Sequence, residues 1–239
     1  MVKKRKNKYT TAIILSAGVG ARFGSDVPKQ IMSLLGKSLV ARAAEPFYQC
    51  DDIDSIVVVT RSEDIDFVNS ELLFLGKKLH KIVPGGTCRA ESARLGFLAV
   101  PSETTHVAIH DGARCLITSD DISSVVNAAY ESGAASAVSL IVDTVKHING
   151  NMITGTASRN ELVLAETPQI FSYDVYKSAL MSSSDISSVT DDNMLVENIG
   201  HKITAVVLAN ENPKITYQKD LDYAEFILER RAKKCSDSE

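Results

Sequence analysis

Short apolar segments alternate along the chain with longer segments in which apolar residues recur at helical spacing. The apolar segments predict strands at residues 11–15, 55–60, 81–83, 106–109 and 135–141. The segments between them predict helices at residues 39–48, 62–75, 89–100 and 119–132. Several strands are nearly continuous runs of Val, Ile and Ala, which is typical of a parallel sheet covered by helices on both faces. The alternation therefore predicts a layered α/β domain with right-handed crossover connections.

The pattern changes after about residue 142. Two strand-like segments at residues 144–148 and 152–154 flank Asn149-Gly150-Asn151, and this arrangement predicts a β-hairpin that turns on Asn-Gly. An isolated two-stranded hairpin is only marginally stable in water, so we expect this β-arm to rest on a second subunit. Farther along, the pattern predicts helices at residues 172–182, 190–199 and 218–231 and a strand at residues 202–208.

The chain shows no internal repeat and no linker rich in Pro or Ser, which favours a single domain. We expect that domain to span residues 10–232, with the β-arm at about residues 142–166. Residues 1–9 carry the basic run Lys3-Lys4-Arg5-Lys6, which we interpret as a disordered, solvated terminus. Residues 233–239 are predicted to form a flexible C-terminal tail.

Composition supports a globular domain and limits its partners. Hydrophobic residues make up 44% of the 239 residues and charged residues 23%, which is ordinary for a protein with a sizeable core. The net charge of −4 argues against a dedicated nucleic-acid-binding protein, and no apolar run approaches the ~20 residues that cross a bilayer. The four cysteines form no C-x-x-C pair and no signal peptide precedes them, so we expect a cytoplasmic protein with reduced thiols.

The first predicted strand leads into a glycine-rich turn that is followed by two cations. The turn reads Ala17-Gly18-Val19-Gly20-Ala21-Arg22, and Pro28-Lys29-Gln30 comes soon after it. Glycine lets the backbone approach a ligand closely, and free N–H groups in such a turn form an anion-binding nest. Arg22 and Lys29 would add full positive charges beside that nest. Because ligands of parallel sheets bind outside the carboxyl ends of the strands, the turn is a candidate phosphate site.

Two better-known glycine motifs do not fit this turn. A P-loop requires Gly-Lys-Ser/Thr at its end, and none occurs here. The dinucleotide fingerprint G-x-G-x-x-G requires its third glycine where Phe23 stands, one residue before Gly24, and Pro28 interrupts the helix that should follow. These departures disfavour an NAD-dependent oxidoreductase, which stays an alternative, as does a plain tight turn that holds no ligand.

Two further loops follow predicted strands and carry candidate chemistry. Pro84-Gly85-Gly86-Thr87-Cys88 presents backbone N–H and C=O groups that suit a flat ligand such as a base, or it serves only as a helix entry. In His110-Asp111-Gly112-Ala113-Arg114, Asp111 follows an apolar strand, where a carboxylate is well placed to hold a metal or a substrate hydroxyl. The structural alternative is an Asp–Arg pair that fixes the loop.

Zinc binding and covalent catalysis are not supported. His106 and His110 have the i, i+4 spacing of a helical zinc pair, but four residues of a strand span roughly 13 Å, too far for one ion. Ser16 lies in Leu15-Ser16-Ala17-Gly18 rather than in a G-x-S-x-G nucleophile elbow. No cysteine has the sequence context of a catalytic nucleophile.

The glycine turns, the aspartate loop and several later segments form an ordered set of motifs. In chain order they are Ala17-Gly18-x-Gly20-x-Arg22 with Pro28-Lys29-Gln30, Gly85-Gly86-x-x-Arg89-x-x-Ser92, His110-Asp111-Gly112-Ala113-Arg114, Asp143-Thr144-x-Lys146, Thr167-Pro168-Gln169-x-Phe171, Thr190-Asp191-Asp192 with Glu197, and Pro213-Lys214-Ile215-Thr216 with Asp220-Leu221. This set resembles the 2-C-methyl-D-erythritol 4-phosphate cytidylyltransferases of the non-mevalonate isoprenoid pathway and covers residues from about 10 to 232. The near relatives are the ribitol-5-phosphate cytidylyltransferases, but Gly112-Ala113-Arg114 and Thr190-Asp191-Asp192 look more like the methylerythritol branch.

The resemblance implies a fold, a reaction and partners. The family has a Rossmann-like α/β fold with a mostly parallel sheet, and it forms homodimers through a β-arm. It uses Mg²⁺ and joins CTP to 2-C-methyl-D-erythritol 4-phosphate, which yields 4-diphosphocytidyl-2-C-methyl-D-erythritol and pyrophosphate. The expected partners are therefore CTP, a polyol phosphate and a second copy of the chain, with no nucleic acid and no membrane.

The matched motifs also imply roles for individual residues. Arg22 and Lys29 would bind the triphosphate and stabilise the transition state. Arg159 and Lys214 would complete the catalytic set by positioning the polyol phosphate. The implied nucleotide-binding residues are Ala17, Gly18, Gly20, Gly86, Thr87 and Ser92. The implied substrate-binding residues are Asp111, Arg114, Thr144, Arg159 and Lys214, with Asp111 also as the metal ligand and with Thr144 and Arg159 supplied by the arm of a second subunit.

Elementary physical chemistry agrees with these roles. Nucleotidyl transfer to a phosphate monoester brings two polyanions together, so positioning and positive charge lower the barrier. The chain departs from the family pattern at Cys115, where proline usually follows the arginine, and at Thr87-Cys88. A nucleotide-binding module without catalysis is a third alternative, beside ribitol phosphate as the substrate and the oxidoreductase.

Overall fold

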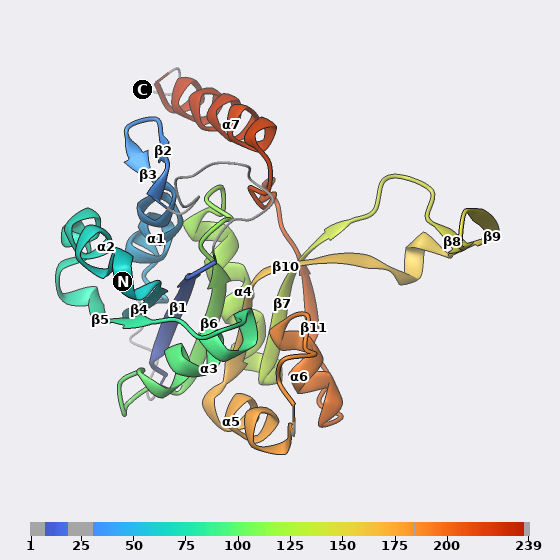
Figure 1. Ribbon diagram of the computed structural model, residues 1–239, viewed down its shortest axis with the longest axis horizontal. Helices are drawn as coiled ribbons and strands as arrows, with labels where there is room; N and C mark the ends of the chain where they lie inside the picture. The colour runs from blue at the N-terminus through green and yellow to red at the C-terminus, as the bar shows by residue number, and fades with distance from the viewer. Residues whose placement is uncertain (1–7, 19–30, 184, 237–239) are drawn as a thin grey trace.

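The computed structural model describes residues 8–18, 31–183 and 185–236. Its centre is a seven-stranded sheet with the order β11-β7-β10-β6-β1-β4-β5 (Figure 1). The strands are β1 (Thr10–Ser16), β4 (Ser55–Thr60), β5 (Leu79–Pro84), β6 (His106–Asp111), β7 (Ala134–Leu140), β10 (Val163–Ser172) and β11 (Thr204–Val207). Neighbouring strands are parallel except β10, which runs antiparallel to β6 and β7. The prediction of a mostly parallel α/β sheet is confirmed.

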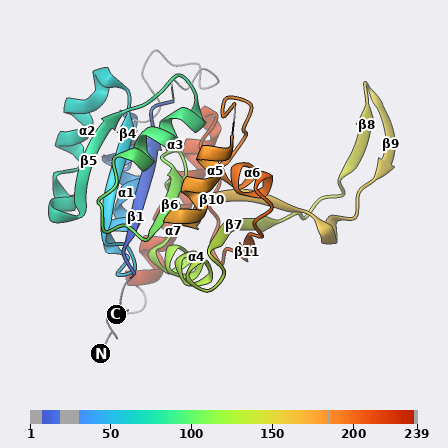
Figure 2. The same ribbon diagram turned by 90° about the horizontal axis from the view of Figure 1, so that it is seen from below.

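Helices cover both faces of this sheet (Figure 2). They are α1 (Leu39–Gln49), α2 (Ile65–Glu71), α3 (Arg89–Leu98), α4 (Ser119–Ser132), α5 (Tyr173–Ser182), α6 (Asp192–Asn198) and α7 (Gln218–Ser236). Helices α1, α2 and α4 share a core with Ile14 of β1, and α3, α5 and α6 share a second core with Ile13. Adjacent residues of β1 are thus buried on opposite faces, which explains the continuous apolar runs in the sequence.

The segment predicted as one helix at residues 62–75 is divided. Two 3₁₀ turns, η3 (Ser62–Asp64) and η4 (Leu73–Lys78), flank α2. Arg61 donates hydrogen bonds of 2.6 and 2.8 Å to the carboxylate of Asp64 and holds the first of these turns. Gly76 has a φ of 51°, a left-handed conformation that interrupts the helical geometry before β5 begins.

Strand β10 is the strand of the central sheet that the sequence pattern does not predict. The pattern places residues 167–169 in the return of the β-arm, whereas the structure places them in a central strand. Proline is rare in central strands because it lacks an N–H donor, and β10 contains Pro168 after a cis peptide bond. The pairing of β10 with β7 shifts between Ala165 and Gln169, so the ladder passes over this proline.

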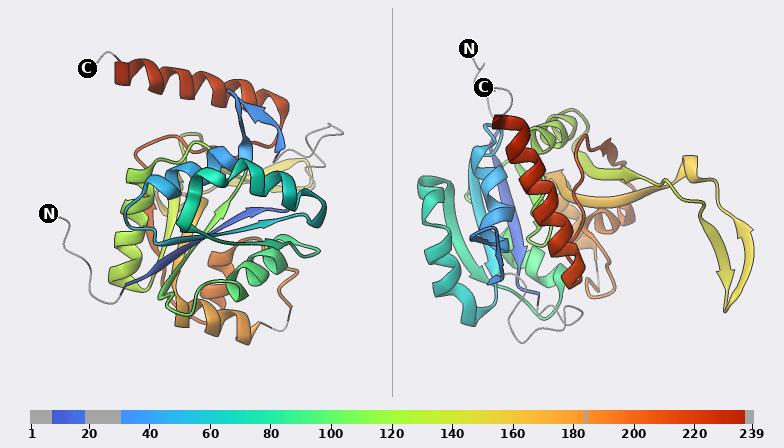
Figure 3. Two further views of the ribbon diagram at one scale, coloured as in Figure 1. Left: turned by 90° about the vertical axis from the view of Figure 1, so that its left-hand side faces the viewer. Right: turned by 90° about the horizontal axis from the view of Figure 1, so that it is seen from above.

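The predicted hairpin is confirmed as β8 (Lys146–Asn149) and β9 (Met152–Thr156), which pair antiparallel. It forms the tip of a β-arm that projects far from the sheet (Figures 1 and 3). Gly150 in the turn has a φ of 54°, which Asn-Gly turns require. The arm exposes large apolar side chains, including Val142, Ile148 and Met152. Within one chain this apolar surface is uncovered.

The two ends of the described chain differ from their predictions. Lys8 donates a 3.0 Å hydrogen bond to the Tyr130 carbonyl, and the Tyr9 backbone bonds to Thr105, so residues 8 and 9 also contact the domain. Helix α7 continues to Ser236, past its predicted end at residue 231. It lies over one end of the domain beside the short hairpin of β2 (Ser33–Leu34) and β3 (Lys37–Ser38) (Figure 3). Among the described residues, no helix combines the length and apolar character needed to cross a membrane.

Candidate active site

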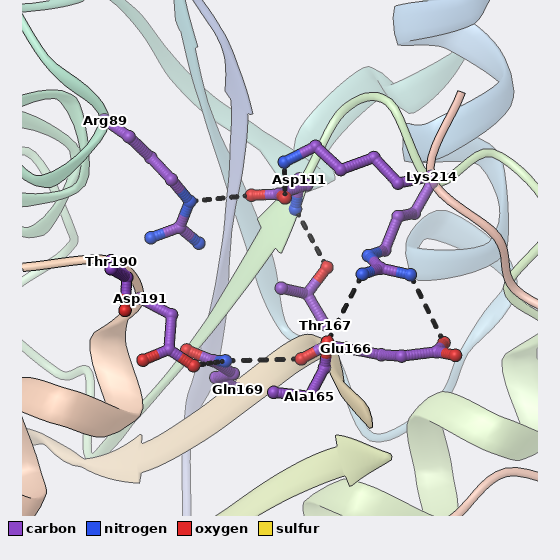
Figure 4. A pocket seen from close by; sticks show the side chains of 10 residues that line it. Arg89, Asp111, Ala165, Glu166, Thr167, Gln169, Thr190, Asp191 and Lys214 are labelled. Atoms are coloured by element: carbon purple, nitrogen blue, oxygen red, sulfur yellow. Dashed lines mark hydrogen bonds and ion pairs between the residues drawn. The ribbon is translucent and has the colours of Figure 1, made fainter. Parts of the chain in front are cut away.

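A pocket of about 260 Å³ opens at the carboxyl end of β6 (Figure 4). Its walls come from the start of α3, the end of β6 and its following loop, β10, the segment before α6 and the segment before α7. The lining residues are Arg89, Asp111, Arg114, Ala165, Glu166, Thr167, Gln169, Thr190, Asp191 and Lys214. Because β10 is antiparallel, its early residues lie at the same sheet edge as the end of β6.

Asp111 is the central carboxylate of this pocket and is only 8% exposed. Its Oδ1 accepts a hydrogen bond from Arg89 Nε at 2.9 Å, and its Oδ2 accepts one from Lys214 Nζ at 2.6 Å (Figure 4). Burial alone would raise the pKa of Asp111, but Arg89 and Lys214 outweigh it and hold that pKa well below its usual range. The aspartate is therefore ionised throughout the neutral and mildly acidic range.

The sequence left open a structural alternative in which Asp111 pairs with Arg114 of the same loop. In the structure Asp111 pairs with Arg89 and Lys214 instead. Arg114 is directed to β10 and to the segment before α7: it donates to the Asn212 carbonyl at 2.7 Å and lies 3.5 Å from Glu166 Oε2. Burial lowers the pKa of Arg114, and the charge of Glu166 opposes that shift. Arg114 therefore joins three walls of the pocket and lines it together with Asp111 and Lys214.

His110 holds the same loop from behind. Its Nε2 lies 2.9 Å from the Arg114 carbonyl, which can only accept, so this nitrogen carries the proton. Burial lowers the pKa of His110 to about 4, so the ring is neutral and its Nδ1 accepts the Thr167 hydroxyl at 3.1 Å. The Thr167 oxygen in turn accepts the Asp111 N–H at 3.0 Å. His110 thus has a structural role, and a zinc site at His106 and His110 stays excluded.

The predicted nucleotide-binding turns after β1 and β5 come together. A Cβ added to Gly85 would lie 2.3 Å from the Cβ of Ala17, so only glycine allows this close approach. The Gly86 N–H donates to Ser92 Oγ at 3.1 Å, which fixes the glycine turn on α3. Thr87 is exposed, and both its N–H and its hydroxyl donate to Glu91 Oε2 at 2.7 Å.

Other predicted residues are not gathered at the pocket. Thr144 and Arg159 lie exposed on the β-arm, where Arg159 Nη1 donates to the Val142 carbonyl at 2.6 Å, and neither residue lines the pocket. The arm itself projects away from the central sheet (Figure 1). Gly18 is exposed next to Ala17. The predicted residues Gly20, Arg22 and Lys29 lie outside the described residues.

Comparison with known proteins identifies the family. The profile of the family described as 2-C-methyl-D-erythritol 4-phosphate cytidylyltransferase matches residues 10–230. A protein of that name from Alkaliphilus oremlandii is 37% identical over 226 residues, which cover 93% of this chain and 96% of that protein. The chain belongs to this family. It is therefore a CTP-dependent nucleotidyltransferase, and the oxidoreductase alternative is wrong.

Solved structures agree with that assignment. The 4-diphosphocytidyl-2C-methyl-D-erythritol synthase of Anaerococcus prevotii superposes with a TM-score of 0.82 at 26% identity, covering 93% of this chain and 97% of that chain. The 2-C-methyl-D-erythritol 4-phosphate cytidylyltransferase of Francisella tularensis has a TM-score of 0.76 at 26% identity, covering 92% of this chain and 99% of that chain. The methylerythritol branch, rather than the ribitol branch, is the one that these similarities support.

The pocket also contains residues for which the family resemblance implied no role, even where they belong to its motifs. Arg89 and Thr190 are motif residues, and the sequence could have marked Arg89 as a candidate, since this cation opens a helix directly after a glycine turn. Glu166 has no sequence signal, because only the antiparallel course of β10 brings it to Asp111 and Arg114. Gln169 is buried and fully used: its amide accepts from Asp192 N at 2.9 Å and donates to Asp191 at 2.8 Å.

The described residues contain no group of three or more His, Cys, Asp or Glu side chains that could hold a metal by themselves. Asp111 offers one carboxylate. A single carboxylate is sufficient for Mg²⁺ when substrate phosphates supply further ligands, and the residues present fit that kind of site. Asp111 Oδ2 accepts a hydrogen bond from Lys214, and it would have to release Lys214 in order to bind the ion.

Proposed function

We propose that the protein transfers the cytidylyl group of CTP to 2-C-methyl-D-erythritol 4-phosphate, with the polyol phosphate bound in the pocket around Asp111. An oxygen of the polyol phosphate attacks the α-phosphorus of CTP in line, a new P–O–P bond forms, and the bond to pyrophosphate breaks. The observation that supports this most is the pairing of one buried carboxylate with two cations, Arg89 and Lys214, at the pocket. A carboxylate accepts polyol hydroxyls, and the cations suit phosphate.

Lys214 is the cation placed to meet the substrate phosphate. Its side chain is 38% exposed, whereas Asp111 beneath it is almost fully buried. The ammonium group sits on a flexible stem and can turn from Asp111 Oδ2 to a phosphate oxygen. A positive charge that follows the reacting phosphate stabilises the charge that develops in the transition state.

The nucleotide is proposed to lie on the turns around Ala17 and Gly86, next to the pocket. Ser92 and the backbone of the glycine turn would bind the base, and Arg22 and Lys29 would bind the triphosphate. Asp111 is the residue that would hold Mg²⁺, which would neutralise phosphate charge when bound beside CTP. Location in the cytoplasm stays a prediction from the sequence.

A homodimer is proposed to complete the site. The β-arm exposes apolar residues that one chain leaves uncovered, and its residues Thr144 and Arg159 do not line the pocket of their own chain. Exchange of arms between two copies would bury that apolar surface and bring a second pair of polar groups to each polyol phosphate.

A pyrophosphate-release assay with CTP and each polyol phosphate tests the reaction. We expect turnover with 2-C-methyl-D-erythritol 4-phosphate and little with ribitol 5-phosphate. Turnover with ribitol 5-phosphate alone would contradict the substrate assignment. Equal, zero turnover by the wild type and by Lys29→Ala would instead support a nucleotide-binding module without catalysis.

Mixing two inactive variants tests the shared site. Lys214→Ala and Arg159→Ala are each expected to be nearly inactive alone. If the site combines Lys214 of one chain with Arg159 of the other, a mixed dimer contains one intact site, and re-equilibrated mixtures recover about a quarter of the wild-type activity. No recovery in mixtures that have demonstrably exchanged subunits would show that both residues act from one chain.

A further inference from the structure

The two cations that hold Asp111 are anchored very differently. Lys214 is paired with Asp111 and, among the described residues, with no second carboxylate. Arg89 has two carboxylate partners: its Nε donates to Asp111 at 2.9 Å, and its Nη1 donates to Asp192 Oδ2 at 2.7 Å. Only one of the two cations is therefore free to leave Asp111 without breaking a second ion pair.

Asp192, the second partner of Arg89, is itself fixed from several sides. It is 1% exposed, and its Oδ1 accepts the hydroxyl of Tyr176 at 2.6 Å. Its backbone N–H donates to Gln169 Oε1 at 2.9 Å. A carboxylate held by an arginine and a phenol, on a backbone fixed by Gln169, has little freedom to rotate.

Tyr176 has no contact with the pocket and belongs to the core. Its ring is fully buried, stacks on Phe171 with centroids 5.5 Å apart, and meets the Phe97 ring edge-on at 5.2 Å. The rings fix where the hydroxyl points, because a packed aromatic side chain has few rotamers. The chain of contacts from Tyr176 to Asp192, Arg89 and Asp111 thus starts in the core between α3, α5 and β10 and ends in the pocket.

We propose that Asp192 and Tyr176 are positioning residues for nucleotidyl transfer. They hold the Arg89 guanidinium on Asp111 Oδ1, so that the Asp111 carboxylate keeps its orientation when Lys214 turns to the substrate phosphate. Arg89 is also the first residue of α3, the helix that carries Ser92 and follows the Gly85-Gly86 turn. The same contacts therefore fix the position of the glycine turn of the proposed nucleotide site relative to the pocket around Asp111.

This inference rests on the proposed function, because it assigns Asp111 and Lys214 their parts in the reaction. Its first test compares three variants by kcat and KM. Misplacement of a substrate-binding group by about 1 Å can cost about 100-fold in rate, so we expect Asp192→Asn to lower kcat/KM for the polyol phosphate about 100-fold. Tyr176→Phe removes only the hydroxyl and is expected to cost about 10-fold, with the KM for CTP little changed.

Tyr130→Phe is the matched control. The Tyr130 hydroxyl lies 2.6 Å from Thr10 Oγ1, at the amino end of β1 and away from the pocket, so its removal also deletes one partly buried hydrogen bond. We expect it to leave kcat/KM unchanged. If Tyr176→Phe and Tyr130→Phe have equal kcat/KM values, Tyr176 has a structural role only and the proposal is wrong.

A double-mutant cycle asks whether Asp192 acts through Arg89. If it does, the variant that combines Arg89→Lys with Asp192→Asn is no slower than Arg89→Lys alone. Multiplication of the two single losses would mean that Asp192 acts independently, which overturns the proposal.

Crystal structures of Tyr176→Phe and Asp192→Asn give a readout that needs no turnover. We expect the Arg89 guanidinium to leave Asp111 Oδ1 in at least Asp192→Asn. An Arg89–Asp111 contact kept at 2.9 Å in both variants would overturn the positioning role. If the wild type does not use CTP with the polyol phosphate, the proposed function fails, whereas this structural readout still decides whether Arg89 depends on Asp192 and Tyr176.

Discussion

The pocket around Asp111 and the β-arm each contain a lysine with one short polar contact, yet the two regions differ in every other respect. Lys214 Nζ lies 2.6 Å from Asp111 Oδ2 in the pocket, and Lys146 Nζ lies 2.7 Å from Thr156 Oγ1 on the arm. The first contact joins a charge to a buried carboxylate that several elements hold. The second lies on an exposed hairpin. Equal distances therefore do not mean equal contributions: burial and the number of anchored partners decide what each lysine does.

The pocket and the β-arm also differ in whether their side chains find partners within one chain. In the pocket, Arg89 and Lys214 form ion pairs with Asp111, and Arg114 lies near Glu166, all within one chain. The arm leaves Ile148 71% exposed and Ile153 67% exposed, which costs free energy as long as the chain is alone. One region is a polar pocket whose ion pairs form within the chain, and the other is an apolar surface that the chain leaves exposed.

The largest effect is expected from Lys214→Ala. Loss of one group that stabilises charge in a transition state costs about 2.7–4 kcal/mol, so kcat/KM for the polyol phosphate should fall about 10²–10³-fold. Steady-state pyrophosphate release measures this. Lys37→Ala, which removes the exposed pair of Lys37 with Glu45, is the control and should retain wild-type activity. A loss below about 10-fold for Lys214→Ala would mean that the pocket does not bind the reacting phosphate.

A second prediction concerns pH and the buried side of the pocket. Burial lowers the pKa of His110 from 6.5 to about 4. The unfolded chain therefore binds a proton on this imidazole more tightly than the folded chain does. His110 therefore leaves stability intact above pH 6.5 and removes roughly 3 kcal/mol of unfolding free energy as the pH falls toward 4. Urea denaturation at several pH values measures this slope.

His110→Asn should lower stability at neutral pH, because two hydrogen bonds of the loop change, but it should also flatten the slope between pH 6.5 and 4. Part of the dependence of stability on pH remains in His110→Asn, because His106 also contributes to it. Burial, and after it the charge of Lys8, lowers the pKa of His106 to about 4. His147→Asn on the exposed arm is the control. The idea fails if His110→Asn and His147→Asn have the same slope as the wild type.

The third prediction addresses the arm. Placing charges on its apolar surface with Ile148→Asp and Ile153→Asp together should shift the molecular mass in light scattering from dimer to monomer. Activity should then fall about 100-fold, because in the proposed dimer each site would lose Thr144 and Arg159 of the second subunit. Leu73→Asp, at a residue 72% exposed on η4, should leave both mass and activity unchanged. A monomeric but fully active double variant would separate the arm from catalysis.

The smallest effect is expected from Lys146→Ala. An exposed polar contact of a flexible lysine contributes little, so the free energy of unfolding should change by less than about 0.5 kcal/mol. Chemical denaturation at neutral pH measures it. A change of more than about 1 kcal/mol would contradict this prediction and would mean that the Lys146 ammonium itself is buried in a contact.

Much of the fold could be predicted from the sequence because local patterns carry it. β1, β4 and β6 are buried on both faces, so their continuous apolar runs predict central parallel strands. The Asn-Gly turn predicts the hairpin of the arm. β10 could not be predicted in this way, because Glu166-Thr167-Pro168-Gln169 interrupts its apolar run and proline is unusual in a central strand.

The sequence by itself determined the order of the loop motifs, and with it the family and the candidates Asp111, Arg114, Lys214, Gly86 and Ser92. These features lie in short segments whose chemistry is visible without knowing what they contact. The tertiary structure decided the partners: Arg89 and Lys214 rather than Arg114 pair with Asp111, and Asp192 with Tyr176 anchors Arg89. Such pairs depend on where α3, α5, β10 and the segment before α7 meet in space. The local sequence of each segment does not encode its distance from the others.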